Sequence, residues 1–261
     1  MLTAEQIDRA SALLADARGR NILLDAIPED IRPRTIGEAY AIQDRLAERL
    51  GRETAGWFCA CTNREIQAML GLAEPYYARL FRSLVMDSPA EIRSADFPPI
   101  AIECEFGFEL GRDLPPRGRP YSRDEVIEAI AAVRPTIEVV AGFLKDWPKQ
   151  DVFSVIADNG TDGALVVGAP VRDWRGLDLK AVPVQLRVNS RAERNGTGAN
   201  VLGDPLEAFV WLVNARARDG EGLKAGHVHN TGTATSLYWS KPGDAFEADF
   251  GPLGIVRLRL T

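Results

Sequence analysis

The stretch that most constrains the fold is 101–110, AIECEFGFEL, in which apolar and acidic residues alternate. Successive side chains of a strand point to opposite faces, so the pattern predicts a strand with one apolar and one acidic face. Glu103, Glu105 and Glu109 share the acidic face. Neighbours two positions apart lie roughly 6.5 to 7 Å apart, close enough for their carboxylates to converge on one point. The stretch therefore predicts either a solvated acidic surface or part of a cation site.

A third carboxylate, Glu138, lies within 135–141, PTIEVVA, a β-branched run typical of a buried strand. A buried carboxylate is costly unless it is paired, neutralised or bound to a metal, so an arginine partner is the structural alternative. Three glutamates from two strands offer oxygen ligands on one side of an ion and leave positions free for a chelating substrate. We therefore expect Glu103, Glu105 and Glu138 to bind Mg²⁺ or Mn²⁺.

Composition limits the function classes. The chain has 261 residues, of which 46% are apolar, enough for a substantial core. Its formal charge of −6 and the absence of a Lys/Arg run argue against a nucleic-acid partner. The polar N-terminal stretch lacks an apolar targeting core, and no apolar run is long enough to span a membrane. We expect a cytoplasmic protein with no membrane partner and with its three cysteines reduced.

Capping signals and apolar spacing predict the helices. Thr3 with Gln6, Thr62 with Glu65, and Ser122 with Glu125 match the capping-box pattern. We expect helices beginning at Thr3, over 35–50 before Gly51, over 62–70, from Ser122 through Val133, over 151–157 and over 205–218.

Short apolar runs predict strands, mostly in the second half of the chain. Besides 101–110 and 135–141, we expect them over 55–61, 164–167, 182–189, 226–230, 245–250 and 255–260. This order predicts an α+β protein with a mixed, mainly antiparallel sheet system. A Pro- and Ser-rich passage over 88–99 predicts a linker. We place the boundary there, between a smaller helical N-terminal subdomain, 1–95, and a β-sandwich or roll catalytic domain, 96–261.

Several polar groups have a structural and a functional interpretation. His227 and His229 could bind a metal, but hydrogen-bonded scaffolding is the favoured interpretation. Cys59 and Cys61 lack the second pair that a zinc site needs, which favours burial. The glycine-rich piece over 195–200 is typical of a tight turn, as is 230–235, whose threonine hydroxyls and backbone N–H groups would also suit a carboxylate.

Seven segments together resemble a known family in their order and spacing. The chain is similar, over nearly its whole length, to the 2-keto-4-pentenoate hydratases and the related 4-oxalocrotonate decarboxylases, within the fumarylacetoacetate-hydrolase-like fold. The resembling segments are AYAIQDRL (39–46), GWFCACTNREIQAMLGL (56–72), ECEFGFEL (103–110), PTIEV (135–139), ADNGTDGALVVG (157–168), GTGANVLGDPLEAFVWLVN (196–214) and LKAGHVHNTGTAT (223–235).

The resemblance implies a metal-dependent lyase of aromatic catabolism that forms a homo-oligomer. Mg²⁺ or Mn²⁺ would be held by Glu103, Glu105 and Glu138. The 2-oxo and carboxylate oxygens of a 2-oxo or 2-hydroxydienoate acid would chelate the ion, which stabilises the enolate as a Lewis acid. The turn after Asp158 and Thr231 or Thr233 would orient the substrate, which is a small-molecule 2-oxoacid.

Further expected substrate contacts are Thr161 in that turn, and Leu70 and Gly71 at the end of the brief helix. A strand that leads into a helix N-terminus also presents N–H groups at which a carboxylate could dock.

This chain departs from the family pattern at two catalytic positions. The family lysine aligns with Phe58, and the usual serine–arginine pair aligns with Gly142 and Phe143. A phenyl ring cannot transfer a proton, so the usual hydration route is in doubt and the catalytic residue is unknown, with Asp158 and Lys145 as candidates. The pocket should also be more apolar, which favours a bulkier or less charged substrate tail.

Two alternatives to hydration therefore stay open. The first is decarboxylation, tautomerisation or C–C hydrolysis of a related 2-oxoacid. The second is a catalytically impaired 2-oxoacid-binding protein, because the family lysine is Phe58.

Overall fold

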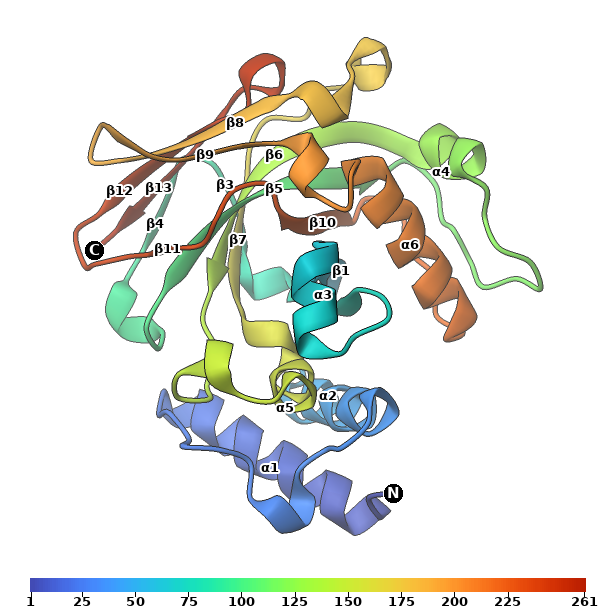
Figure 1. Ribbon diagram of the computed structural model, residues 1–261, viewed down its shortest axis with the longest axis vertical. Coiled ribbons are helices and arrows are strands. Elements are labelled where there is room, and N and C mark those ends of the chain that lie inside the picture. The colour runs from blue at the N-terminus through green and yellow to red at the C-terminus, as the bar shows by residue number, and fades with distance from the viewer.

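The computed structural model describes residues 1–261 as two curled β-sheets with helices packed on them (Figure 1). The eight-stranded sheet has the order β2-β1-β10-β5-β6-β7-β3, and β11 pairs with β5. Its strands are β1 (Thr54–Ala60), β2 (Tyr76–Phe81), β3 (Val85–Asp87), β5 (Ala101–Leu110), β6 (Ile130–Val140), β7 (Asp162–Val167), β10 (Val228–Thr233) and β11 (Tyr238–Trp239).

The five-stranded sheet has the order β4-β13-β12-β8-β9. The two sheets are mixed but mainly antiparallel, since only β1–β10, β3–β7 and β4–β13 pair in parallel. The expected α+β class is therefore what the chain adopts. The strands of this sheet are β4 (Ala90–Ile92), β8 (Pro183–Val188), β9 (Arg191–Thr197), β12 (Ala245–Asp249) and β13 (Ile255–Leu260).

Six α-helices complete the fold: α1 (Ala4–Arg20), α2 (Ile36–Leu50), α3 (Arg64–Leu70), α4 (Arg123–Ala129), α5 (Val152–Ala157) and α6 (Pro205–Arg218). The N-terminal α1 and α2 lie together at one end of the molecule, with α5 between them and the sheet (Figure 1). No helix has the length and apolar character needed to cross a membrane.

The apolar face of β5 determines where its acidic face points. Ile102, Cys104 and Phe106 belong to a large core that also contains residues of the five-stranded sheet and of α6. Because side chains alternate along a strand, Glu103 and Glu105 are directed to the opposite side of the sheet. On that side lie α3 and α5, which line a cavity together with these glutamates, and the N-terminal pair, which packs against α5.

Some helix boundaries differ from the sequence prediction. Asn63, not Thr62, caps α3, because its side-chain oxygen accepts hydrogen bonds from the N–H groups of Glu65 and Ile66. The helix expected to continue through Val133 ends at Ala129. Ile130 and Val133 pair instead with Leu110 and Phe108 of β5, since β-branched residues accept either structure and the partner strand decides.

The strand prediction was wrong in three stretches. Residues 195–197, expected as a tight turn, end β9, and 230–233, expected as part of a turn, belong to β10. β4 lies in the expected linker and pairs with β13. In each case a neighbouring strand supplies the hydrogen-bond partners that a glycine- or proline-rich segment lacks by itself.

The helical part of the N-terminal region is shorter than the 1–95 subdomain that we expected. The boundary falls next to a short 3₁₀ helix (Ser94–Asp96), but β1, β2, β3 and β4 all precede it. Of these, β1, β3 and β4 pair with strands from the second half of the chain, and β2 pairs with β1. The part that is purely helical is the α1–α2 pair.

Candidate metal centre

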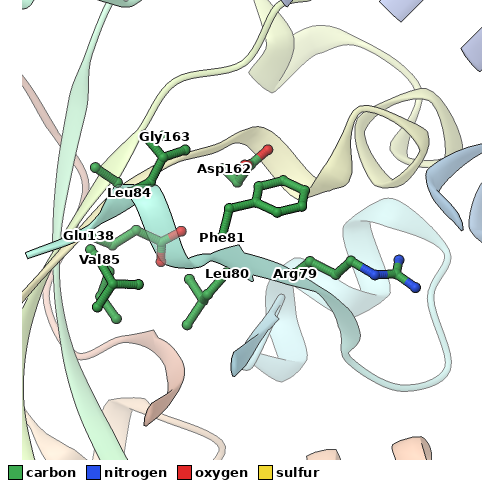
Figure 2. Close-up of a pocket in the computed structure, with 10 residues that line it drawn as sticks. Arg79, Leu80, Phe81, Leu84, Val85, Glu138, Asp162 and Gly163 are labelled. Atoms are coloured by element: carbon green, nitrogen blue, oxygen red, sulfur yellow. The ribbon is translucent and has the colours of Figure 1, made fainter. Parts of the chain in front are cut away.

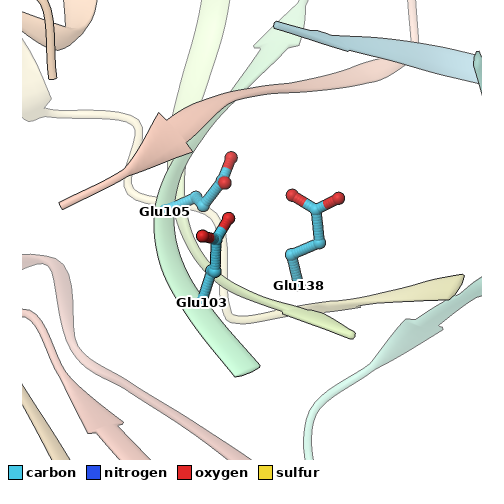
Figure 3. Close-up of side chains that lie close together, drawn as sticks. All are labelled: Glu103, Glu105 and Glu138. Carbon is cyan, nitrogen blue, oxygen red and sulfur yellow. The ribbon is translucent and has the colours of Figure 1, made fainter. Parts of the chain in front are cut away.

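Glu103, Glu105 and Glu138 converge on one point (Figure 3). One carboxylate oxygen from each lies within 4.8 Å of the other two. The register of β5 and β6 causes this convergence, because Glu103 is directly opposite Glu138 and Glu105 follows two residues along the same face. Cross-strand pairing thus unites carboxylates that are 35 positions apart in sequence, from Glu103 to Glu138.

The three carboxylates have no cationic partner. Glu105 and Glu138 are buried and Glu103 is partly buried, yet none of them forms a salt bridge with a lysine or arginine. The solvated surface and the arginine pair, which were the structural alternatives, are therefore absent.

Burial raises the pKa of all three glutamates, and the neighbouring carboxylates raise it further. The pKa of Glu138 rises to about 8, first through burial and then through the charge of Glu103. The pKa values of Glu103 and Glu105 are raised by burial and then by the charges of Glu105 and Glu138, respectively. Such a group requires either protons or a cation, and its all-oxygen anionic donors fit Mg²⁺ or Mn²⁺.

Two groups of β10 hold the carboxylates in place. The Asn230 Nδ2 atom donates to Glu105 Oε2 at 2.7 Å and to Glu138 Oε2 at 2.9 Å. The Gly232 N–H donates to Glu105 Oε2 at 2.7 Å. The remaining oxygens of the three glutamates accept no hydrogen bond from the protein, so they are free to bind a cation. Support of this kind fixes the orientation of ligands and raises affinity for a metal.

Only glycine fits at position 232. Its φ of +90° is in the region that side chains rarely adopt, and a Cβ atom there would lie 2.0 Å from Thr62 Oγ1. The bulge between Asn230 and Thr233 in the β10–β5 pairing lets this N–H point at Glu105.

The backbone N–H groups of 230–235 were expected to suit a carboxylate, and the Gly232 N–H binds that of Glu105. The role of the Asn230 side chain was not expected. No local sequence pattern identifies a side-chain amide whose hydrogen-bond partners lie on two strands distant in sequence.

A cavity of about 740 Å³ opens beside the three glutamates. Several expected site residues line it: Phe58, Leu70, Thr161 and Thr233. Gly71 and Thr231 do not; the Thr231 hydroxyl is buried and donates to the Phe106 carbonyl oxygen at 3.0 Å. Of the two threonines expected to orient a substrate, the cavity lining therefore contains Thr233 and not Thr231.

The two candidate catalytic residues lie outside the cavity lining. Asp158 is buried, pairs with Arg18 at 2.9 Å and accepts a hydrogen bond from the Phe143 N–H at 2.7 Å. Lys145 is largely exposed, and its Nζ atom lies 3.5 Å from Asp25. Both therefore have structural partners elsewhere, which corrects their assignment as catalytic candidates.

A second cavity is lined by residues that include Arg79, Glu138 and Asp162, with the Arg79 side chain directed away from Glu138 (Figure 2). Its volume of about 10 Å³ is near the smallest that holds one water molecule. This second cavity is therefore too small to hold a substrate.

The histidines do not join the acidic group. His229 is buried, and its Nδ1 atom accepts a hydrogen bond from the Trp57 N–H at 3.1 Å. Burial lowers its pKa to about 3. This is the scaffolding role that the sequence favoured. Cys59 is buried, as expected, and Cys61 is partly buried in the cavity lining.

Comparisons with known proteins show which family and fold this chain shares. The family model described as fumarylacetoacetate (FAA) hydrolase C-terminal matches residues 61–261. A 2-keto-4-pentenoate hydratase of Paraburkholderia xenovorans is 32% identical, with 98% of this chain and 95% of that protein covered. A 2-hydroxyhexa-2,4-dienoate hydratase of Comamonas testosteroni is 30% identical, with 98% and 96% covered.

Two solved structures are also similar. The 4-oxalocrotonate decarboxylase from Pseudomonas putida G7, complexed with magnesium and adipate, has a TM-score of 0.91 and 27% identity, and the match covers 100% of this chain and 99% of that one. The fumarylpyruvate hydrolase from Pseudomonas aeruginosa, in complex with Mn²⁺ and pyruvate, has a TM-score of 0.59 and 13% identity over 79% and 88% of the chains. The second match shows a shared fold alone.

Proposed function

Because the chain belongs to the fumarylacetoacetate hydrolase family and is a lyase-type enzyme like its hydratase and decarboxylase relatives, we propose that it hydrates a 2-oxo or 2-hydroxydienoate acid. Glu103, Glu105 and Glu138 hold the divalent cation, Mg²⁺ or Mn²⁺, on which this activity depends. The observation that carries the proposal is the convergence of three carboxylates, two buried and one partly buried, without a cationic partner, at the edge of a large cavity.

When bound, the cation supplies Lewis acidity toward the 2-oxo and carboxylate oxygens of the substrate. The chain supplies the positioning. Asn230 holds the Oε2 atoms of Glu105 and Glu138, and the Gly232 N–H also holds Glu105 Oε2. Because these carboxylates are held before the substrate arrives, little reorganisation is needed when it binds.

The proton donor must replace the family lysine, because the Phe58 ring cannot transfer a proton. Apart from the three glutamates, the ionisable side chains in the cavity lining are Tyr76 and Cys61. Burial raises the pKa of both, that of Cys61 to about 12 and that of Tyr76 well above 10. Both groups are therefore protonated at neutral pH.

Tyr76 is the better placed of the two. Its ring lies beside Phe58, since a Cβ atom at Gly160 would be 3.0 Å from the Tyr76 ring and 3.1 Å from the Phe58 ring. Its hydroxyl makes no hydrogen bond within the chain, so it is free for a substrate. We assign Tyr76 as the proton donor to the substrate carbon skeleton.

Decarboxylation is the second candidate. The structure of the 4-oxalocrotonate decarboxylase superposes over the full chain with a TM-score of 0.91. Hydration is preferred because the relatives above 30% identity are hydratases.

Loss of the ultraviolet absorption of 2-hydroxypenta-2,4-dienoate tests the proposal. We expect turnover with Mg²⁺ or Mn²⁺ and none with excess EDTA, and product analysis by mass spectrometry separates addition of water from loss of CO₂. Turnover that continues unchanged in EDTA would contradict the metal-dependent mechanism. The homo-oligomer is a separate proposal, which light scattering of the purified protein checks.

A further inference from the structure

The lining of the large cavity contains no cationic side chain. Of its 27 residues, the only charged ones are Glu103, Glu105 and Glu138; lysine, arginine, histidine and aspartate are absent. We propose that the substrate carries a single carboxylate and a large uncharged tail, such as an aryl or a long hydrocarbon group. This inference rests on the proposed function, because it concerns the tail of the 2-oxo acid at the same site.

A second carboxylate on the substrate would have no partner. Three glutamates and one divalent cation leave a formal charge of −1, and the carboxylate next to the 2-oxo group adds another. The cations of nearby segments lie outside the lining: Arg18 is buried between Asp158 and Asp162, and Lys145 and Lys149 are exposed beside Asp25 and Asp146. Arg64 of α3 is exposed and is not among the lining residues. A charged tail would therefore be desolvated in a negative site without compensation.

The side of the cavity formed by helices is apolar. α3 contributes Ile66, Met69 and Leu70, and α5 contributes Val152 and Val155. Two of these are exposed despite their size, Ile66 at 41% and Met69 at 72%. Exposed large apolar residues grouped at a cavity are typical of ligand-binding surfaces. A hydrocarbon tail would cover them.

The size of the cavity also favours a tail longer than that of pentenoate. Cavities of roughly 300 to 1,000 Å³ bury ligands of drug size, and this one has about 740 Å³. Each methylene that becomes buried contributes about 0.8 kcal/mol, which is roughly a fourfold gain in affinity. A five-carbon acid would leave most of the apolar lining uncovered.

Calorimetric titration of the Mg²⁺-loaded protein tests the inference with five commercially available 2-oxo acids. Pyruvate reports the metal-dependent chelation site alone. We expect phenylpyruvate and 2-oxohexanoate to bind at least about tenfold more tightly than pyruvate, given the gain per buried methylene. We expect 2-oxoglutarate to bind at least about tenfold more weakly than 2-oxopentanoate, which has the same chain length but an uncharged tail.

The outcomes distinguish the inference from the proposed function. If pyruvate does not bind in a Mg²⁺-dependent manner, the proposed function fails and the inference fails with it. If pyruvate binds but the tails make no difference, or 2-oxoglutarate binds as tightly as 2-oxopentanoate, only the inference is overturned.

A charge introduced into the lining gives an independent test. Met69→Arg places a cation at an exposed position of α3, and we expect the Kd ratio of 2-oxoglutarate to 2-oxopentanoate to fall at least about tenfold. Ile66→Arg is a second variant at an exposed lining position. Leu23→Arg is the matched control, because Leu23 is similarly exposed at 41% but lies outside the cavity lining. An unchanged ratio in both α3 variants would overturn the inference.

Discussion

Glu103 lies directly opposite Glu138 in the antiparallel pairing of β5 and β6. Like charges directly opposite each other destabilise a sheet. Neither Glu103 nor Glu138 forms a salt bridge with an arginine or lysine that would offset this repulsion. The chain therefore bears a local cost in its metal-free state, and a bound divalent cation would remove it. This relationship leads to predictions about affinity and stability with opposite signs.

Glu138→Gln should abolish most of the affinity for Mn²⁺ while it stabilises the metal-free protein. We expect a loss of ~100-fold or more, since removal of a ligand costs more than removal of its supporting residues. The free energy of unfolding in EDTA should rise by about 1 kcal/mol because one buried, repelled carboxylate is gone. Calorimetry with Mn²⁺ and urea unfolding measure the two effects.

Glu109→Gln is the control for that variant. Glu109 lies on the same face of β5, but it pairs with Arg134 at 3.2 Å and takes no part in the acidic group. Its Mn²⁺ affinity should equal that of the unmodified chain, and a loss similar to that of Glu138→Gln would refute the three-glutamate site.

Asn230→Ala should lower Mn²⁺ affinity by roughly 10- to 100-fold although Asn230 is not a proposed ligand. Its amide joins Glu105 to Glu138, so its loss frees both carboxylates to rotate. Calorimetry measures the affinity, and Asn195→Ala, which alters the lining without touching the glutamates, is the control. Equal affinities in the two variants would show that Asn230 does not position the site.

Tyr76→Phe should lower kcat by about 10²- to 10⁴-fold, the usual contribution of a general acid. Mg²⁺-dependent pyruvate binding should be unchanged, because only a hydroxyl without a partner in the chain is removed. Steady-state kinetics and calorimetry give the two values. Tyr238→Phe, outside the cavity lining, is the control. Full turnover by Tyr76→Phe would transfer the role to Cys61.

Stability should fall below pH 6.5 in a manner that depends on His229. Burial lowers the pKa of His229 from 6.5 to about 3, so between these values the unfolded chain binds a proton that the folded chain does not. The free energy of unfolding therefore decreases as the pH falls through this range, by up to about 1.4 kcal/mol per unit for this group.

His229→Asn tests that prediction, because the asparagine oxygen can still accept from the Trp57 N–H. Urea titrations from pH 7.5 to 4.5 give the unfolding free energies of the parent and the variant. Below pH 6.5 their difference should change by up to about 1.4 kcal/mol per pH unit, which corresponds to one proton per molecule. His227→Asn, at a half-exposed position, should show a smaller shift. A parallel pH dependence in the parent and His229→Asn would contradict the assignment.

The sequence predicted well wherever the signal was local. The alternation over 101–110 and the β-branched run over 135–141 specified two strands, and the face on which Glu103 and Glu105 lie, because side-chain direction along a strand has a period of two. Helix ends marked by Thr3, Thr35 and Gly51 were also correct, since capping involves groups within a few residues of one another.

Distant contacts were where prediction failed. Asp158 looked like a free carboxylate in a turn, but Arg18 from α1 reaches it and neutralises it. Ile130 and Val133 have the spacing of a helical face, but they belong to β6 because they pair with residues of β5.

By itself, the sequence determined that acidic side chains would lie on one face of a strand beside an apolar core, because that follows from local geometry and burial. Only the tertiary structure decided that Glu138 would meet Glu103, that Asn230 would join Glu105 to Glu138, and that no cation would line the cavity. The physical reason is that strand register and the neighbours of each strand are set by the packing of the whole chain, and no local stretch contains them.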